Sequence, residues 1–244
     1  MHRVNIVYTG SADSAFNWQH YLNKHLPIAC GVSSRHAPII RCDVDRPIEL
    51  NIRASAQDNA STNDTIIAIC TVYFSSGEIQ NDFRHFFASS HQDSAQILAD
   101  EPNYTKIQPS FNAGYFKSSD NTERPGSYRA KFLFPRQAQP LDTNAVETIV
   151  ATLATHLDDQ DIDIAGNEID YCQFDVPPDS ASAYECIVTL NFADKHNLAR
   201  AARYLSTTKK HSFGEQLDVK PLTTCSEIVN FDLARCEPYL HTEC

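Results

Sequence analysis

The sequence predicts an α+β protein in which two ferredoxin-like β-α-β-β-α-β repeats close one barrel. Three observations lead to this prediction. The predicted elements follow the same order in residues 1–118 and in residues 128–244. The stretch 119–127, rich in polar residues with Pro and Gly, has the composition of a linker. The apolar run 69–74 resembles 187–192, which is typical of an internal duplication.

The first repeat opens with a predicted strand at 3–9 and a helix at 15–26. Apolar alternation favours the strand, and turn residues follow it. The helix carries two sets of residues spaced four apart, which are Trp18, Leu22 and Leu26 on an apolar stripe and Asn17, Tyr21 and His25 beside it. We expect Pro27 to end the helix, because proline lacks an N–H and disfavours helical geometry in the residue before it.

The remainder of the first repeat supplies three strands and a second helix. Residues 37–52 are predicted as one long strand with a turn or bulge at 45–47, and residues 54–63 as a polar loop. The apolar run 65–74 predicts a central strand. A helix follows, in which Phe83, Phe86 and Phe87 are expected to be core residues rather than a ligand cage, and a further strand ends at residue 116.

The second repeat shows the same order of elements. Strands are predicted at 129–134, 167–176, 184–192 and 224–233, a turn at 177–180, and helices at 144–157 and 198–205. A four-stranded sheet with both helices on one face leaves its other face apolar and bare. We therefore expect the two sheets to cover each other and close a barrel, which also protects their edges. His156 matches His25 in register and is expected to be exposed.

Composition narrows the function classes. The chain has 42% hydrophobic and 21% charged residues, as a globular protein does, and a net charge of -11. An acidic surface repels phosphate backbones and anionic lipid, so we expect no nucleic-acid or membrane partner. No apolar run reaches the ~18 residues of a membrane span. The eight cysteines form no CxxC pair, and no apolar signal segment opens the chain, so a cytoplasmic protein with reduced thiols is expected.

Several kinds of chemistry lack their motif. The sequence contains no Gly-rich phosphate loop, no G-x-S-x-G and no H-E-x-x-H. His20 and His25 lie five residues apart, about 140° round a helix, so they cannot share a metal ion on one face. We therefore expect no metal site.

Two stretches resemble the signatures of the EthD family. Residues 16–27 carry a Phe, a Tyr and a His-x-Pro ending, and 99–109 read Ala-Asp-Glu-Pro-Asn-Tyr-Thr-Lys-Ile-Gln-Pro. The resemblance spans about residues 3–116 and implies the dimeric α+β barrel superfold, whose members include cofactor-free monooxygenases, polyketide cyclases, muconolactone isomerases and haem enzymes. Asn17 stands where the family usually has Asp. The second half lacks both signatures and resembles a degenerate copy, so the chain is expected to be a monomeric pseudo-dimer or a homodimer.

His25 and Tyr21 are the candidate catalytic residues. Imidazole suits a general acid or base at the mouth of a cavity, because its unperturbed pKa lies near working pH. Tyr21 would orient His25 or donate to a substrate carbonyl. The alternatives are a histidine that satisfies the last carbonyls of its helix and a tyrosine that simply packs.

A second set of residues is expected to contact the substrate: Asn17, His91, Asn103, Tyr104 and Gln108. Polar groups at the rim of a pocket fix the orientation of a ligand. The alternatives are that Asn103 belongs to a turn, that Tyr104 fills the core, and that His91 lies in a surface loop.

Three hypotheses of function remain open. The first is an enzyme that binds a small apolar or aromatic carbonyl compound in the barrel and acts by cofactor-independent acid–base catalysis, of cyclase, lyase, isomerase or monooxygenase type. The second is a non-catalytic binding or accessory module for a hydrophobic metabolite, which the missing Asp at position 17 favours. The third, haem-dependent redox chemistry, rests on fold analogy alone. We expect no cofactor.

Overall fold

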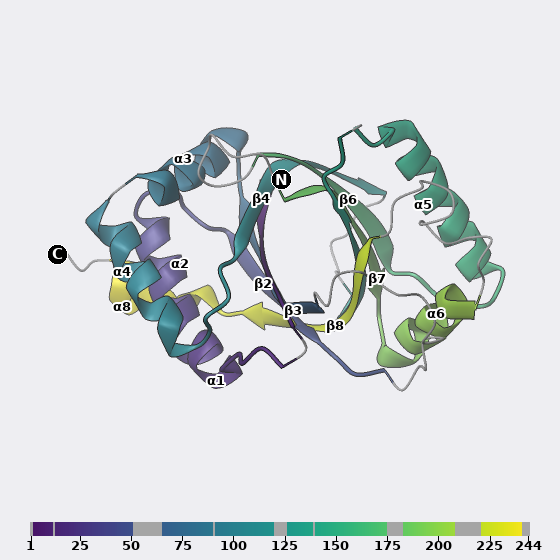
Figure 1. Ribbon diagram of the computed structural model, residues 1–244, viewed down its shortest axis with the longest axis horizontal. Helices are drawn as coiled ribbons and strands as arrows, with labels where there is room; N and C mark the ends of the chain where they lie inside the picture. Colours follow the sequence, from purple (N-terminus) through teal and green to yellow (C-terminus); the bar gives the residue numbers. More distant parts are fainter. Residues whose placement is uncertain are drawn as a thin grey trace.

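The computed structural model forms a closed eight-stranded antiparallel barrel with helices on its outside (Figure 1). It describes residues 2–11, 13–50, 65–89, 91–119, 126–138, 140–174, 183–207 and 221–240. Figure 1 looks into the barrel, with α1 to α4 and α8 on one side and α5 and α6 on the other. Among the described residues, no helix has the length and apolar character needed to cross a membrane.

The strands and helices follow the order that the sequence predicts. The strands are β1 His2–Gly10, β2 Arg41–Pro47, β3 Thr65–Phe74, β4 Ser110–Ser119, β5 Tyr128–Pro135, β6 Gly166–Phe174, β7 Tyr184–Phe192 and β8 Leu222–Phe231. The α-helices are α1 Trp18–His20, α2 Leu26–Ser34, α3 Gly77–Ala88, α4 Gln92–Asp100, α5 Thr143–Asp158, α6 Lys195–Thr207 and α8 Glu237–Leu240. A π-helix, η1 Tyr21–His25, joins α1 to α2, and short 3₁₀ turns, η2 Glu101–Asn103 and η4 Leu233–Cys236, precede Tyr104 and α8.

The order of strands around the barrel follows one pattern twice. Strands β4-β1-β3-β2 come from the first half of the chain, and β8-β5-β7-β6 from the second. The two sets join where β2 pairs with β8 and β4 with β6. The register also matches, since His2 pairs with Phe74 in the first half and Tyr128 with Phe192 in the second. Closure leaves no free sheet edge, as expected.

Most predicted strands occur at their predicted positions, and 65–74 and 184–192 match β3 and β7 throughout. The predicted strand 37–52 is too long, because β2 covers Arg41–Pro47 and β8 becomes its second neighbour. Residues 51–53, the predicted loop 54–63 and the predicted turn 177–180 lie outside the described residues.

The prediction that Pro27 ends the first helix is wrong. The chain stays helical from Trp18 to Ser34, and Pro27 is the second residue of α2. The π-turn before Pro27 lets the helix continue. The N–H of Leu26 donates to the carbonyl of Tyr21, five residues earlier, so the helix is wider at this turn. The wider turn makes room for the proline ring, which would collide with the preceding turn of a regular α-helix. The bulge also buries Tyr21 and His25, whereas Trp18 and Leu22 of the expected apolar stripe are only partly buried.

The two largest apolar cores lie between the barrel wall and the helices. In the first half, Val4 and Tyr8 of β1 pack with Tyr21 and Phe83, and in the second half Leu190 packs with Leu153. Phe83 and Phe86 are buried and Phe87 packs against them, so these aromatic residues are part of the core, although Phe83 and Phe87 also line a small cavity described below. Each sheet therefore buries its outward face against its own helices.

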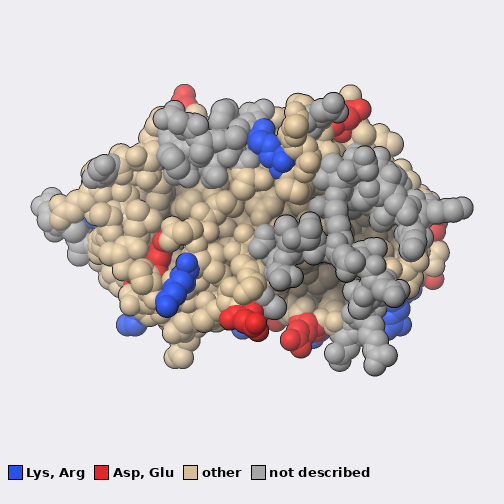
Figure 2. All heavy atoms as spheres, in the orientation of Figure 1, with Lys and Arg blue, Asp and Glu red and all other residues tan. Residues whose placement is uncertain are grey.

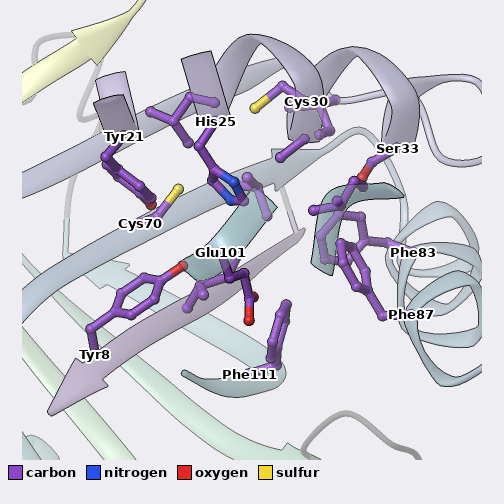
Figure 3. Close-up of a pocket in the computed structure, with 16 residues that line it drawn as sticks. Tyr8, Tyr21, His25, Cys30, Ser33, Cys70, Phe83, Phe87, Glu101 and Phe111 are labelled. Atoms are coloured by element: carbon purple, nitrogen blue, oxygen red, sulfur yellow. The ribbon is translucent and has the colours of Figure 1, made fainter. Parts of the chain in front are cut away.

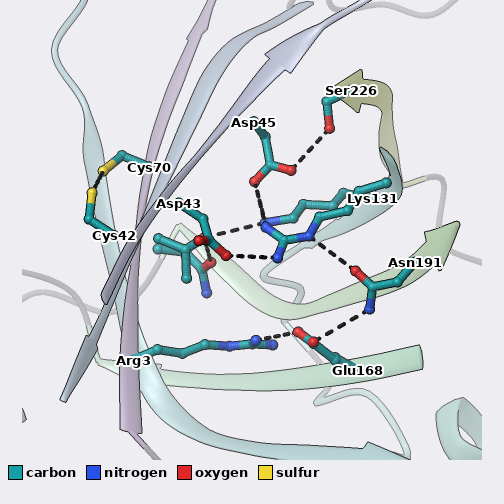
Figure 4. A network of polar contacts seen from close by, with 12 residues as sticks. Arg3, Cys42, Asp43, Asp45, Cys70, Lys131, Glu168, Asn191 and Ser226 are labelled. Atoms are coloured by element: carbon teal, nitrogen blue, oxygen red, sulfur yellow. Dashed lines mark hydrogen bonds and ion pairs between the residues drawn. The ribbon is translucent and has the colours of Figure 1, made fainter. Parts of the chain in front are cut away.

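The inward face of the barrel is apolar only in part, which corrects the expected apolar face. Val7, Ile69, Leu133 and Ile187 form a buried apolar cluster on it, and charged side chains occupy the rest. Arg3, Asp43, Asp45, Arg129, Lys131, Glu168 and Asp170 are each at most 5% exposed and form one network (Figure 4). Arg3 Nε and Nη2 lie 2.6 and 2.8 Å from the two oxygens of Asp170, and Arg3 also bonds Glu168. Buried charges persist where each is paired and hydrogen-bonded, and these pairs satisfy that condition across the barrel.

The outer surface seen in Figure 2 carries scattered charge. Lys and Arg side chains are few on that face, and Asp and Glu side chains lie among large uncharged areas without forming a patch of one sign. Within the described residues of that face, nothing resembles the basic stripe that nucleic-acid backbones require.

Candidate active site

The two stretches that resemble the EthD signatures lie side by side. The backbone N–H of Asn17 donates to the carbonyl of Tyr104 at 2.8 Å, and Phe16 forms a β-bridge with Thr105. The Asn17 side chain accepts from the backbone N–H of His20, so it caps the start of the helix. These contacts hold η1 against the end of α4, and the side chains of His25 and Asp100 meet there.

Asp100 binds two histidines. Its Oδ2 lies 3.1 Å from His25 Nδ1, its Oδ1 lies 3.0 Å from His20 Nε2, and the Asn103 amide donates to it at 2.9 Å. Burial works to raise the pKa of Asp100, but the hydrogen bonds from Asn103, His20 and His25 outweigh it and hold the pKa below its ordinary value. An ionised carboxylate only accepts, so Nδ1 of His25 carries a proton and donates it.

His25 is a neutral imidazole with a basic Nε2. Only 4% of the residue is exposed, and burial lowers its pKa to about 4, although the hydrogen bond with Asp100 acts in the opposite direction. With Nδ1 protonated, the Nε2 lone pair faces the Tyr104 hydroxyl at 3.3 Å. The Tyr104 hydroxyl in turn lies 3.0 Å from that of Tyr8. A chain of hydrogen bonds therefore runs from Asp100 through His25 and Tyr104 to Tyr8.

Aromatic rings fix the imidazole in place. Tyr21 stacks on His25 with a centroid distance of 5.5 Å and an interplanar angle of 16°, and the Tyr104 ring lies 4.4 Å away. Burial raises the pKa values of Tyr8, Tyr21 and Tyr104, so all three phenols stay protonated. Tyr21 thus positions His25, and no hydrogen bond between their polar atoms is seen.

A small, mainly apolar cavity adjoins this chain (Figure 3). It lies between the outer face of the first sheet and the helices, not inside the barrel, so it differs from the expected location. Its polar lining comes from Tyr8, Tyr21, His25, Ser33 and Glu101, and its apolar lining includes Phe111. Its volume of about 30 Å³ holds a group of the size of a carbonyl, not a whole aromatic ring.

A larger groove lies on the other side of Tyr104. It has a volume of about 690 Å³ and is lined by residues 14–17 and 102–107. Asn17 and Asn103 are exposed along it, and the buried Tyr104 also lines it. Tyr104 therefore connects the two spaces, because the residue lines the groove and its hydroxyl contacts Tyr8 and His25, which line the cavity.

The predicted site residues divide into those that meet here and those that do not. Tyr21, His25 and Tyr104 come together, with Asn17 and Asn103 at the groove. Gln108 is exposed and lines neither space, and His91 begins α4 elsewhere. His91 lies near His36 and Asp93, whose carboxylate pairs with His36 at 2.8 Å and with Arg35 at 3.2 Å. His156 is partly buried on α5.

Three residues of the site escaped sequence reasoning: Asp100, Glu101 and Tyr8. Asp100 and Glu101 stand in the second EthD-like stretch, so the resemblance could have pointed to them. Tyr8 fits the apolar alternation of the first strand, and nothing in the neighbouring sequence marks it as a site residue. Hydrogen bonding to Tyr104, 96 residues away in sequence, gives it a polar role.

Fold and site together define an α+β barrel protein with a buried histidine–carboxylate pair beneath one set of helices. Similar solved structures include an anthrone oxidase-like protein, 12% identical, with a TM-score of 0.56 over 93% of this chain and 91% of that one. Another is a candidate chlorite dismutase, 10% identical, with a TM-score of 0.50 over 98% of each chain. At such identities these likenesses establish the fold alone.

An EthD-like protein from Ralstonia eutropha is also similar, at 19% identity and a TM-score of 0.36, over 50% of this chain and 96% of that one. No protein-family model matches the sequence, and no curated protein matches it.

Haem does not fit at His25. An axial ligand needs a nitrogen that faces open space, but Asp100 engages Nδ1 and Tyr104 engages Nε2. The adjoining cavity of about 30 Å³ is also far smaller than a macrocycle requires. We therefore derive no chemistry through haem.

Proposed function

We propose that this chain is a cofactor-independent acid–base enzyme that acts on the carbonyl end of a small, mostly apolar compound. The observation that carries the proposal is the neutral imidazole of His25, held by Asp100 on one nitrogen and open to a hydroxyl chain on the other. A general base needs an unprotonated nitrogen at working pH and a partner for the cation that forms, and this pair supplies both.

The proposed step is proton abstraction from the carbon next to a carbonyl group. The carbon–hydrogen bond of the ligand breaks, and its electron pair becomes an enolate. The proton enters the chain at Tyr8, which passes its own proton to Tyr104, and Tyr104 passes its proton to Nε2 of His25. The imidazolium is then stabilised by the Asp100 carboxylate 3.1 Å away. Isomerisation, cyclisation, lyase chemistry and oxidation of the carbanion by O₂ can each begin this way.

The groove is the proposed site for the body of the ligand. Its volume lies in the range of ligand pockets, whereas the cavity alone accommodates only the reacting end. Asn17 and Asn103 would supply polar contacts at its rim, and the Tyr104 side chain would have to move for a ligand to reach both spaces. Gln108 and His91 line neither space, so they are not part of this proposed ligand site.

We further propose that the chain is an internal pseudo-dimer, in which residues 128–244 supply the sheet that a second subunit would otherwise provide. The support is a reciprocal pairing. Arg3 of β1 binds Glu168 and Asp170 of β6, and Arg129 of β5 lies 2.9 Å from Asp43 and 3.4 Å from Asp45 of β2. In this proposal the chain is a monomer or a homodimer of such pseudo-dimers, its partners are small molecules, and it works in a reducing compartment such as the cytoplasm.

The test measures proton exchange without knowledge of the product. Purified protein is incubated in D₂O with a panel of aromatic and polyketide-like ketones, and NMR follows deuterium entering the carbon next to the carbonyl. We expect exchange with the wild type, a loss of at least about a hundredfold in His25→Ala with affinity retained, and no change in the control His85→Ala on the exposed face of α3.

Two other outcomes would contradict the proposal. A ketone that binds both proteins but exchanges in neither would make the chain a binding module. Equal exchange in wild type and His25→Ala would remove His25 from the chemistry. An absorption spectrum and a native mass spectrum of freshly purified protein would show any bound coloured group or metabolite, and a Soret band would overturn the cofactor-free proposal.

A further inference from the structure

Glu101 is a buried carboxyl group that the proton chain does not use. It opens η2 directly after Asp100, and its residue is 8% exposed. Its backbone carbonyl accepts hydrogen bonds from the backbone N–H groups of Tyr104 and Thr105, which stabilise the turn. Its side chain lines the cavity with Tyr8 and His25 and points toward Phe111 (Figure 3).

The Glu101 carboxyl group has no hydrogen-bond or ion-pair partner among the described residues. Burial alone acts on it, which raises its pKa to about 7. An unpaired buried carboxylate is costly, so about half of the group is the neutral acid at pH 7 and most of it at pH 6. Asp100, the next residue, is ionised because three side chains donate to it. Adjacent carboxyl groups therefore differ in protonation.

The groups around the cavity do not alter this balance. The titratable side chains that line it with Glu101 are Tyr8, Tyr21, His25, Cys30 and Cys70. His25 is neutral above about pH 4, and the tyrosines remain protonated. None of them carries a positive charge at neutral pH, so none holds Glu101 ionised. A protonated carboxyl group in an apolar cavity is a hydrogen-bond donor that a ligand with an acceptor atom can satisfy.

We propose that Glu101 is a ligand-binding residue, whose protonated carboxyl group donates a hydrogen bond to the carbonyl oxygen of a neutral ligand in the cavity. This rests on the proposed function, since it places the acceptor beside the proton chain that ends at His25. It also defines the substrate class as neutral ketones or aldehydes. A carboxylate ligand would bring a negative charge into a mainly apolar space beside the Glu101 carboxyl group, so we expect it to be rejected.

In the reaction, the same hydrogen bond stabilises the enolate oxygen. When the carbon–hydrogen bond breaks, negative charge moves to that oxygen, and the Glu101 proton can transfer to it. The products of the step are then a neutral enol, an ionised Glu101 and a protonated His25, and return of both protons regenerates the starting enzyme. Glu101 can act as the acid and His25 as the base of this step, because the pKa values of the two groups are separated.

The test begins on the protein without ligand. Infrared spectra across pH 5 to 9 would follow the carbonyl-stretch band of a protonated carboxylic acid in wild type, in Glu101→Gln and in the control Glu78→Gln, an exposed residue of α3. We expect a band that titrates near pH 7 in wild type and in the control and is missing from Glu101→Gln. Ordinary acidic titration of Glu101 would overturn the proposal.

Binding separates this proposal from the proposed function. Acetophenone and benzoate are similar in size and differ in charge, and calorimetry would measure both at pH 6 and pH 8. We expect wild type to bind acetophenone and reject benzoate, with about tenfold weaker acetophenone binding at pH 8. Glu101→Leu should lose about tenfold at pH 6, whereas Glu101→Gln keeps a donor and should bind equally at both pH values.

Each other result has a distinct meaning. Acetophenone that fails to bind at either pH, binds Glu101→Leu as well as wild type, or binds no better than benzoate would overturn the role of Glu101. Failure of the proposed function shows differently. In that case the pH-dependent binding persists, but no variant or wild type exchanges deuterium into the ketone.

Discussion

Asp100 holds His25 by a 3.1 Å hydrogen bond to Nδ1 and thereby fixes which nitrogen of the imidazole is basic. Because Asp100 is ionised and can only accept, the proton stays on Nδ1 and the lone pair of Nε2 faces Tyr104. The carboxylate lies on the residue before η2, and the histidine on the π-turn η1. The site therefore depends on contact between two segments far apart in sequence.

Replacing Asp100 by Asn should disturb this arrangement. The amide can donate as well as accept, so the proton on His25 is no longer confined to Nδ1, and the loss of the negative charge lowers the pKa of His25 further. Nitrogen NMR of the histidine rings would report the tautomer directly. The control is Asp82→Asn, at an exposed position of α3. An unchanged His25 tautomer in Asp100→Asn would refute the role given to Asp100.

The stability of the protein should fall in mild acid. The pKa of His25 is about 4 in the folded state and 6.5 when unfolded, so the unfolded state takes up the proton first. Unfolding free energy is therefore lost as pH falls from about 6.5 to 4, by roughly 3 kcal/mol from this residue. Urea denaturation across that window should show a shallower dependence for His25→Asn than for wild type or for the exposed control His85→Asn. Parallel curves for all three proteins would contradict the prediction.

Removing the charge of Arg129 should cost much more than removing that of Arg46. Arg129 is 1% exposed and pairs with Asp43 and Asp45, so Arg129→Met leaves both carboxylates buried beside one cation fewer. We expect a loss of about 3 to 5 kcal/mol in unfolding free energy. Arg46 pairs with Glu227 across the same β2–β8 boundary, but the two side chains are 43% and 35% exposed. Arg46→Met should therefore cost less than about 1 kcal/mol. Equal losses of unfolding free energy in the two variants would contradict the idea that the buried ion pairs hold the two halves together.

The first half should not be a stable monomer. Residues 1–118 alone would present Arg3 and Asp45 without their partners, would leave Asp43 with Arg41 but without Arg129, and would have β2 and β4 as open edges. We expect this fragment to dimerise, one copy taking the place of the second half, or to remain unfolded. Light scattering and circular dichroism would distinguish these states. A folded monomer of the fragment would rule out the internal pseudo-dimer.

The sequence predicted the elements well because their signals are local. Apolar runs such as 65–74 and 184–192 report burial directly, and turn residues mark where strands end. The prediction that Pro27 ends the helix failed because it used local information only. The missing N–H of Pro27 is a local fact, but the π-turn that accommodates it forms as the preceding residues pack Tyr21 and His25 against β1 and Tyr104.

By itself, the sequence determined the order of strands and helices, the apolar faces that pack on them, and the candidates His25, Tyr21 and Tyr104. Only the tertiary structure decided what the polar strand faces do. Arg3, Asp43 and Glu168 alternate with apolar neighbours, a pattern that ordinarily predicts a solvated face. Barrel closure turns that face inward, where charges must be paired to remain, and the pairs come from opposite halves of the chain. Such long-range pairing leaves no local pattern in the sequence, and the contact of Asp100 with His25 is of the same kind.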